Sequence, residues 1–277
     1  MQDKRLCRRG FLAAAGCLAA GCAAMDRLFG PSDKANPYAP FLMGAQSYCF
    51  RKFSFEDALK KTQELGLHYI EAFPGHFKSN SAPAEIEAMK AKLKSMDITL
   101  NAYGVCGFSK DHEKNKQLFE FAKAAGIPHL SANPQPDALD SLEKLVEEYQ
   151  INIAIHNHGP KSLYSSDEDI RKVVEGRSNR IGLCIDTGHF MRSDVNPVDV
   201  VREFSPRIHG VHLKDAKDKK DCIVGTGNLD LVGFLQALKE IGFKGYFSLE
   251  YESDPDDPVP AMRECLANTR ATIAKLR

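Results

Sequence analysis

The sequence predicts a single α/β domain in which eight parallel strands, each followed by a helix, close into a (β/α)8, or TIM, barrel. Short apolar segments alternate with amphipathic helical patterns from residue 42 to the C-terminus. The strand-helix unit recurs about every 30 residues, a spacing that suits such a barrel. An open, doubly wound sheet is the alternative, but eight regular units favour closure of the sheet.

Eight strands are expected where short apolar runs occur. They cover residues 42–48, 68–73, 98–103, 128–132, 151–156, 181–186, 207–213 and 245–250. Apolar residues recur at three- and four-residue steps between these runs and predict helices, for instance at 55–66, 84–96, 113–126 and 231–242. Gly66, Gly126 and Gly242 stand where three of these helices should end before the next strand.

The first 22 residues have the pattern of an export signal. Basic residues precede an apolar segment of about a dozen small residues, which is too short to span a bilayer. RRGFL (residues 8–12) resembles a twin-arginine signal, and LAAGC (residues 18–22) resembles a lipoprotein cleavage box that would place a lipid on Cys22. Ordinary cleavage near Ala23 or Ala24 is the alternative. We therefore expect an exported protein, periplasmic or held at the membrane by that lipid, with a linker at 23–41 and the barrel at 42–277.

The composition of the body excludes several classes of protein. Removing residues 1–21 removes four basic residues and one acidic residue, so the formal net charge falls from 0 to −3. A mildly acidic body argues against a nucleic-acid partner. The cysteines beyond Cys22 are odd in number, scattered and without CxxC spacing, which indicates buried free thiols rather than disulfides or a zinc knuckle. The oligomeric state stays open, a homo-oligomer included.

Polar residues end strands five to eight of the predicted barrel. His156, Asp186, His212 and Glu250 are separated by 30, 26 and 38 residues, each about one strand-helix unit. Along each strand the apolar residues alternate with this polar set, so the polar set should face the barrel axis. Two carboxylates without a cation would repel each other there. The four residues therefore predict a divalent metal site.

Several phrases resemble the sugar phosphate isomerase/epimerase superfamily, the xylose-isomerase-like barrels that include inosose dehydratases, ketose 3-epimerases and endonuclease IV. They are IEAFPGHF (70–77), HNHG (156–159), DTGH (186–189), HLKD (212–215), GTG (225–227) and SLEYE (248–252). The resemblance implies that Asp186, His212 and Glu250 bind a metal ion. Many relatives have a glutamate as the fourth ligand, where this chain has His156.

The exchange of a carboxylate for the His156 imidazole has two consequences. A donor set with more nitrogen shifts the preference from Mg²⁺ toward Mn²⁺, Zn²⁺ or Fe²⁺. The missing glutamate is also one of the two acid–base groups of the ketose epimerases, so their two-base mechanism cannot apply unchanged.

Further candidates surround the predicted metal site. His158 shares a face with His156 and should support the ligands or contact the substrate. Glu71 closes the second strand and is expected to bind substrate or transfer a proton, with structural hydrogen bonding as the alternative. His189 could reach a substrate oxygen. Lys214 could steady an oxyanion, unless it is a solvated loop lysine. Glu250 is expected to take part in catalysis as well as in metal binding.

Four other features are less closely tied to the chemistry. His76 follows the second strand, and the sequence leaves both a structural and a functional role open for it. His209 has the parity of Val211 and should pack outside the barrel. Glu252 ranks behind Glu250 because it lies beyond the strand end. The charged run at 214–221 is expected to be a solvated loop, and GTG (225–227) a loop near the barrel mouth.

The leading functional hypothesis is a metal-dependent isomerase or epimerase acting on an unphosphorylated sugar or polyol, since an exported enzyme meets its substrate outside the cytoplasm. A divalent ion would acidify the C–H bond next to a carbonyl group and stabilise an enediolate. The alternative is a lyase or dehydratase that eliminates a β-substituent from a keto-sugar or keto-glycoside. A non-catalytic sugar-binding lipoprotein is a third class. The acidic body and the export signal oppose phosphodiester hydrolysis of the endonuclease IV kind.

Overall fold

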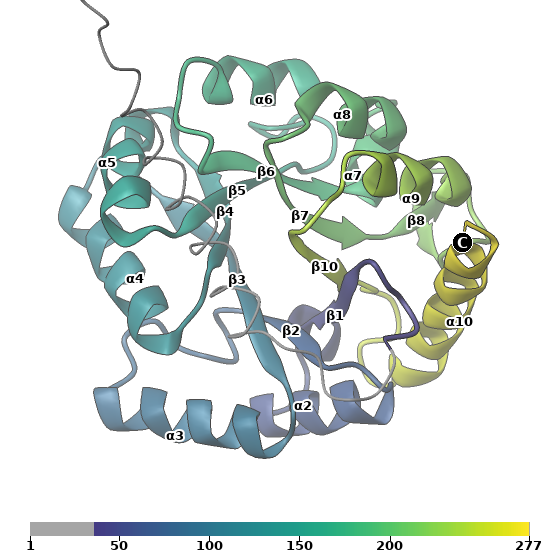
Figure 1. Cartoon of the computed structure of the whole chain (residues 1–277), viewed down its shortest axis with the longest axis horizontal. Coiled ribbons are helices and arrows are strands. Elements are labelled where there is room, and N and C mark those ends of the chain that lie inside the picture. Colours follow the sequence, from purple (N-terminus) through teal and green to yellow (C-terminus); the bar gives the residue numbers. More distant parts are fainter. Residues whose placement is uncertain (1–35, 277) are drawn as a thin grey trace, which may run out of the picture. The chain divides into compact units, whose positions relative to one another are not determined.

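A computed structural model describes residues 36–276, and in this part of the chain eight parallel strands form a closed barrel (Figure 1). The first strand pairs with both the second and the last, so the predicted closure is confirmed. The barrel strands are β1 (Leu42–Gln46), β2 (Tyr69–Ala72), β3 (Thr99–Phe108), β4 (His129–Pro134), β5 (Asn152–His156), β6 (Ile181–Asp186), β7 (Ile208–Leu213) and β10 (Tyr246–Leu249).

Helices surround the barrel and separate its strands along the chain (Figure 1). Gly66, Gly126 and Gly242 adopt positive φ angles of 74°, 74° and 64° where α2, α4 and α9 end, as the sequence predicts. The helices are α2 (Phe55–Glu64), α3 (Pro83–Ser95), α4 (His112–Ala125), α5 (Leu139–Tyr149), α6 (Asp167–Val174), α7 (Thr187–Arg192), α8 (Pro197–Phe204), α9 (Leu231–Glu240) and α10 (Val259–Lys275), with short 3-10 helices η1 (Ser47–Phe50) and η2 (Pro136–Ala138).

Side chains alternate along the strands between the barrel interior and the helices. Leu183 and Ile185 of β6 belong to the large core that the barrel shares with the helices. Cys184 lies instead in a small cluster inside the barrel, together with Tyr246 of β10. This alternation confirms the predicted parity and directs the last polar residues of the strands toward the axis.

His209 departs from this alternation, and the prediction that it packs outside the barrel is wrong. The pairing of β6 with β7 shifts register, from Leu183 beside Ile208 to Cys184 beside Gly210, so His209 is an extra residue. A Cβ atom on Gly182 would lie 2.7 Å from Cδ2 of His209. The His209 ring also lies 6.2 Å from the ring of His129. The β-bulge therefore directs the His209 side chain into the barrel interior, at the amino-terminal end of the strands.

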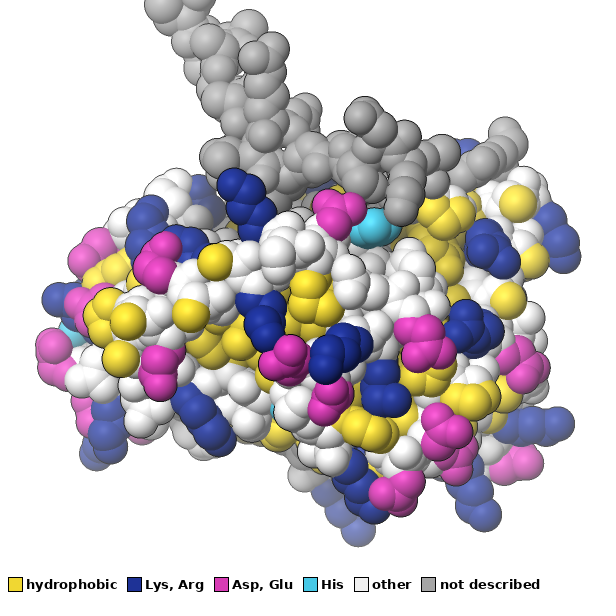
Figure 2. All heavy atoms as spheres, turned by 90° about the horizontal axis from the view of Figure 1, so that it is seen from below, with side chains coloured by type: hydrophobic (Ala, Val, Ile, Leu, Met, Phe, Trp, Pro, Cys, Tyr) yellow, Lys and Arg dark blue, Asp and Glu magenta, His cyan; other side chains and the backbone are white. Residues whose placement is uncertain are grey.

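The predicted export signal and lipidation site, and most of the predicted linker, lie outside the described residues. At the end of the linker, Tyr38 and Phe41 are buried, with 5% and 2% of their surface exposed. None of the helices among residues 36–276 is both long enough and apolar enough to cross a membrane. On the face shown in Figure 2, acidic and basic side chains of the described residues are interspersed rather than gathered into a basic stripe.

Replacing Gly210 with alanine should destabilise the barrel from within. Gly210 pairs with Tyr246, and a Cβ atom at this position would lie 2.0 Å from the Tyr246 ring. Overpacking of this kind costs about 1–3 kcal/mol of unfolding free energy. Urea denaturation should therefore give a lower midpoint for Gly210→Ala. The control is Gly107→Ala in β3, where a Cβ atom would meet nothing within 4 Å. Equal midpoints for the two variants would contradict this account of the interior.

Candidate active site

The four predicted ligands meet at the carboxyl end of the barrel. His156 and Asp186 are the last residues of β5 and β6, His212 is the next-to-last residue of β7 and pairs with Asp186, and Glu250 directly follows β10. All four are buried, and one potential ligand atom from each lies within 4.8 Å of the others. We call this set the four-residue cluster. The closed barrel brings them together because neighbouring parallel strands end at the same rim.

The distances within the four-residue cluster suit a shared metal ion. His156 Nε2 lies 2.9 Å from His212 Nδ1 and 3.4 Å from Asp186 Oδ2. His212 Nδ1 lies 2.9 Å from Glu250 Oε2. Ligand atoms that each stand about 2.0–2.2 Å from one ion lie roughly 3 Å apart.

The donor chemistry also fits a divalent cation. Asp186 Oδ2 and Glu250 Oε2 are buried, and although both form ion pairs with Lys214, neither accepts a hydrogen bond of good geometry from the described chain. Burial lowers the pKa of His156 to about 4, although the neighbouring Asp186 opposes this shift in part. The low pKa keeps the imidazole in its neutral form, which is the form that binds metals. We therefore propose the four-residue cluster as a metal site of two nitrogens and two oxygens.

Lys214 is buried beside this cluster. Its Nζ atom lies 3.1 Å from Asp186 Oδ2 and 3.0 Å from Glu250 Oε2, and it also contacts Glu252. Burial opposes the charged form, but the carboxylates of Asp186 and Glu250 hold the pKa of Lys214 well above its usual value. With 3% of its side chain exposed, Lys214 is not a solvated loop lysine. Its ammonium group offsets part of the negative charge of the two carboxylates.

Glu71 faces the axis, as predicted, but lies beneath the cavity rather than in its wall. It is fully buried and accepts hydrogen bonds from Ser131 and, at 3.0 Å, from Ser248. His212 Nε2 lies 2.7 Å from Glu71 Oε2. Because Nδ1 of His212 faces the four-residue cluster, its Nε2–H donates to Glu71, an arrangement that orients metal-binding histidines. The geometry thus favours the structural alternative for Glu71 over substrate contact.

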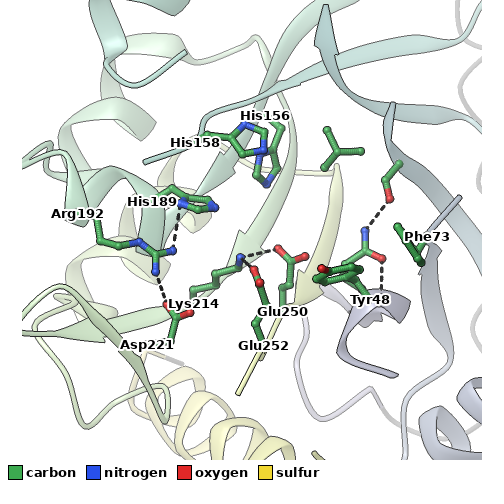
Figure 3. Close-up of a pocket in the computed structure, with 13 residues that line it drawn as sticks. Tyr48, Phe73, His156, His158, His189, Arg192, Lys214, Asp221, Glu250 and Glu252 are labelled. Atoms are coloured by element: carbon green, nitrogen blue, oxygen red, sulfur yellow. Dashed lines mark hydrogen bonds and ion pairs between the residues drawn. The ribbon is translucent and has the colours of Figure 1, made fainter. Parts of the chain in front are cut away.

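A cavity of about 420 Å³ opens above the cluster (Figure 3). His158, His189, Lys214 and Glu250 all line it, so four of the five residues predicted for catalysis share one space. The rings of His158 and His189 lie 5.4 Å apart. Burial lowers the pKa of both imidazoles, that of His189 to about 4, so both are neutral at pH 7.

Several residues of the cavity wall were not identified from the sequence. Tyr48 and Phe73 lie across the cavity from His189, and their rings meet edge to face at 4.9 Å (Figure 3). Both closely follow the carboxyl end of a barrel strand, β1 or β2. Residues at these strand ends face the active site of such barrels, so the same reasoning that identified the metal ligands could have identified Tyr48 and Phe73. Arg192 and Asp221 also line the cavity. They follow no barrel strand directly, and no local signal marks them.

Asp215 explains both the charged run and the GTG loop. Its carboxylate accepts hydrogen bonds from the backbone N–H groups of Gly225 and Gly227, each at 2.9 Å, and of Leu229 at 3.0 Å. A Cβ atom on Gly227 would lie 2.2 Å from this carboxylate, so the loop needs glycine there. The charged run is therefore not simply a solvated loop: it forms a hairpin of β8 (Asp215–Lys217) and β9 (Lys220–Cys222), whose Asp221 reaches the cavity.

The contacts of His76 favour a structural role over a functional one. Its ring stacks on Phe55 at 5.6 Å, and its two nitrogens lie 3.0 Å from Ser47 Oγ and 3.2 Å from the carbonyl oxygen of Phe53. It does not line the cavity described above. Glu252, which ranked behind Glu250, does line the cavity and contacts Lys214.

Comparisons with known proteins agree with the barrel fold. A family model described as a xylose isomerase-like TIM barrel matches residues 59–272. An inosose dehydratase of Clostridium botulinum is 26% identical over 254 residues, which cover 73% of this chain and 83% of that enzyme. An uncharacterised protein from Parabacteroides distasonis is 29% identical, with a TM-score of 0.69 over 86% of this chain and 100% of that one. The 3-keto-D-glucoside 4-epimerase of E. coli has the same fold, with 16% identity and a TM-score of 0.68 over 83% and 99% of the two chains.

Asp186→Asn should abolish tight metal binding. Asparagine keeps an oxygen for the backbone N–H of His189, which Asp186 Oδ1 accepts at 2.7 Å, but removes the charge. Affinity for Zn²⁺ or Mn²⁺, measured by competition with a chromophoric chelator, should fall by more than about 100-fold, beyond the effect of a supporting residue. Asp221→Asn changes a carboxylate of the same cavity outside the cluster and should leave the affinity unchanged. Unaltered binding by Asp186→Asn would remove Asp186 from the site.

Glu71→Gln should weaken metal binding indirectly, through His212. Loss of the carboxylate that orients the ring is expected to lower the metal affinity about 10–100-fold. The same competition assay measures this, and circular dichroism verifies the fold. If Glu71 contacts the substrate instead, Glu71→Gln should keep full metal affinity and lose turnover. That result would contradict the structural role of Glu71.

Proposed function

Because this chain belongs to the xylose isomerase-like TIM barrel family, we propose that it is a metal-dependent lyase that removes water or another β-substituent from an unphosphorylated keto-sugar or keto-polyol. The chain is an enzyme of this superfamily. Its similarity to an inosose dehydratase over 83% of that enzyme supports elimination. The observation that carries the proposal is the cavity that joins the four-residue cluster to the neutral imidazole of His158.

The four-residue cluster would hold the cation at the floor of the cavity. When bound there, a divalent ion polarises a carbonyl oxygen and thereby acidifies the adjacent C–H bond. The nitrogen-rich donor set favours Mn²⁺, Zn²⁺ or Fe²⁺ over Mg²⁺. His189 can donate a hydrogen bond to an oxygen in the same space, whereas the ammonium group of Lys214 faces three carboxylates.

His158 is the proposed proton-transfer group. It lines the cavity, and its Nδ1 atom is buried without a hydrogen-bond partner within the described chain. The neutral imidazole can take the proton from carbon and, as an imidazolium, return it to the leaving oxygen. A carbon–carbon double bond forms, the C–H and C–O bonds break, and water leaves. One group therefore suffices for elimination on one face of the substrate.

Isomerisation or epimerisation is the second candidate. Epimerisation returns the proton to the opposite face of the carbon, so it needs a second group. Glu250 enters the cavity from the end of β10, whereas His158 enters from the loop after β5 (Figure 3). This placement supports a two-group mechanism in which His158 replaces the glutamate that this chain lacks.

The charges of the cavity support an unphosphorylated substrate. Its two permanent cations are both paired: Arg192 with Asp221 at 2.8 Å, and Lys214 with three carboxylates. The lining carries Asp221, Glu250 and Glu252 against these two cations, a formal balance of −1. When Asp186 and the charge of the proposed divalent cation are included, this balance becomes zero, so the cavity offers a phosphate dianion no excess positive charge. We also propose export, on the basis of the N-terminal signal pattern, which suits a substrate found outside the cytoplasm.

The function is tested by incubating the Mn²⁺- or Zn²⁺-loaded enzyme in D₂O with aldoses, ketoses, inososes and 3-keto-glycosides. We expect NMR to show loss of an α-proton and an unsaturated product from a cyclic keto compound. His158→Gln should keep its metal and lose this reaction. A deuterated isomer without loss of a leaving group would establish the second candidate. Absence of both exchange and product with every compound would contradict the proposed chemistry.

A further inference from the structure

Three side chains form a row along one wall of the cavity (Figure 3). Arg192 Nη1 donates to Asp221 Oδ1 at 2.8 Å, and Arg192 Nη2 lies 3.1 Å from His189 Nδ1. His189 and Arg192 belong to α7, and Asp221 belongs to β9, 29 residues after Arg192. All three line the cavity. We call this row the Asp221–Arg192–His189 chain.

The order of donors and acceptors in the chain selects one tautomer of His189. A guanidinium group carries only donors and is always charged. The His189 Nδ1 atom must therefore accept from Arg192, and the proton of the neutral ring lies on Nε2. An Nδ1–H tautomer would place two N–H groups against each other at 3.1 Å. Arg192 therefore determines both the orientation of the His189 ring and the group, Nε2–H, that the ring presents to the cavity.

The free end of His189 faces the proposed reaction site. Its Nε2 atom lies 3.9 Å from Asp186 Oδ2, and its ring lies 5.8 Å from the ring of His156. The backbone N–H of His189 donates to Asp186 Oδ1 at 2.7 Å, which ties this helix turn to a residue of the four-residue cluster. An oxygen of a substrate in this space would therefore meet an N–H donor.

The position of Asp221 is set by the fold around it. Asp221 pairs with Ala216 across the β8–β9 hairpin. The hairpin begins at Asp215, whose carboxylate holds Gly225, Gly227 and Leu229 through their backbone N–H groups. Arg192 is consequently held from one side by a hairpin that is anchored to the barrel.

We propose that Asp221 and Arg192 are positioning residues that fix His189 as an Nε2–H donor to a carbonyl or hydroxyl oxygen of the substrate. In this role His189 binds substrate and does not remove its proton. The substrate role rests on the proposed function, whereas the choice of tautomer can be examined without substrate. The two parts can therefore fail separately.

The tautomer is tested by long-range ¹H–¹⁵N NMR of the Zn²⁺-loaded chain. The spectrum of His189→Gln identifies the His189 signals among those of nine histidines. The wild type should show the Nε2–H tautomer. Arg192→Met, which keeps a long side chain and removes the donors, should give a mixture of tautomers. Arg171→Met is the control, because Arg171 pairs with Glu203 on the surface of α6. A wild-type Nδ1–H tautomer, or an unchanged tautomer in Arg192→Met, would overturn the proposal.

Kinetics on the compound that the wild type converts test the positioning role. Arg192→Met should lower kcat about 10–100-fold, as loss of a supporting hydrogen bond does, with a smaller change in KM and unchanged metal content. Asp221→Asn should lower kcat in the same direction but less, because Arg192 can still donate to His189. This second variant keeps the test valid if Arg192→Met folds poorly. A rise in KM alone, with kcat intact, would make Arg192 a direct substrate contact and overturn the proposal.

Discussion

The two buried carboxylates of Asp186 and Glu250 impose the main constraint on this site. They converge at the end of the barrel, where the surrounding protein cannot solvate charge as water does. Their negative charge must be balanced locally, and Lys214 supplies part of the balance. The proposed divalent cation supplies the rest. The imidazoles of His156 and His212 add nitrogen donors without adding negative charge, which distinguishes this cluster from one built on three carboxylates.

Two further carboxylates, of Glu71 and Asp215, hold the surroundings of the four-residue cluster in place. Beneath it, Glu71 is held by serines of β4 and β10 and orients His212. Beside it, Asp215 anchors the hairpin that carries Asp221. Buried carboxylates thus have three separate roles here: proposed metal binding (Asp186 and Glu250), a hydrogen bond that orients His212 (Glu71) and the anchoring of a loop (Asp215). Each role follows from what the carboxylate contacts and how deeply it is buried.

His156 connects the cluster to the proposed reaction. A glutamate at this position in related enzymes would be both a ligand and an acid–base group, whereas an imidazole bound to metal cannot also take a proton. We therefore assign the proposed proton-transfer role to His158, which lies two residues further along the chain and in the cavity wall. Lys214 and Arg192 are both paired with carboxylates, which supports the proposed unphosphorylated substrate. Together these features support the proposal of a neutral, oxygen-rich substrate.

The sequence by itself determined the barrel and the four polar residues that meet at its rim, because both depend on local periodicity. Alternation with period two marks the inward residues of each strand, and the strand ends of a parallel barrel share one rim. Only the tertiary structure decided which other residues reach the site. The bulge that turns His209 inward depends on pairing between two strands. The depth of Glu71 and the meeting of Arg192 with Asp221 depend on contacts between segments far apart in the chain, which no local pattern records.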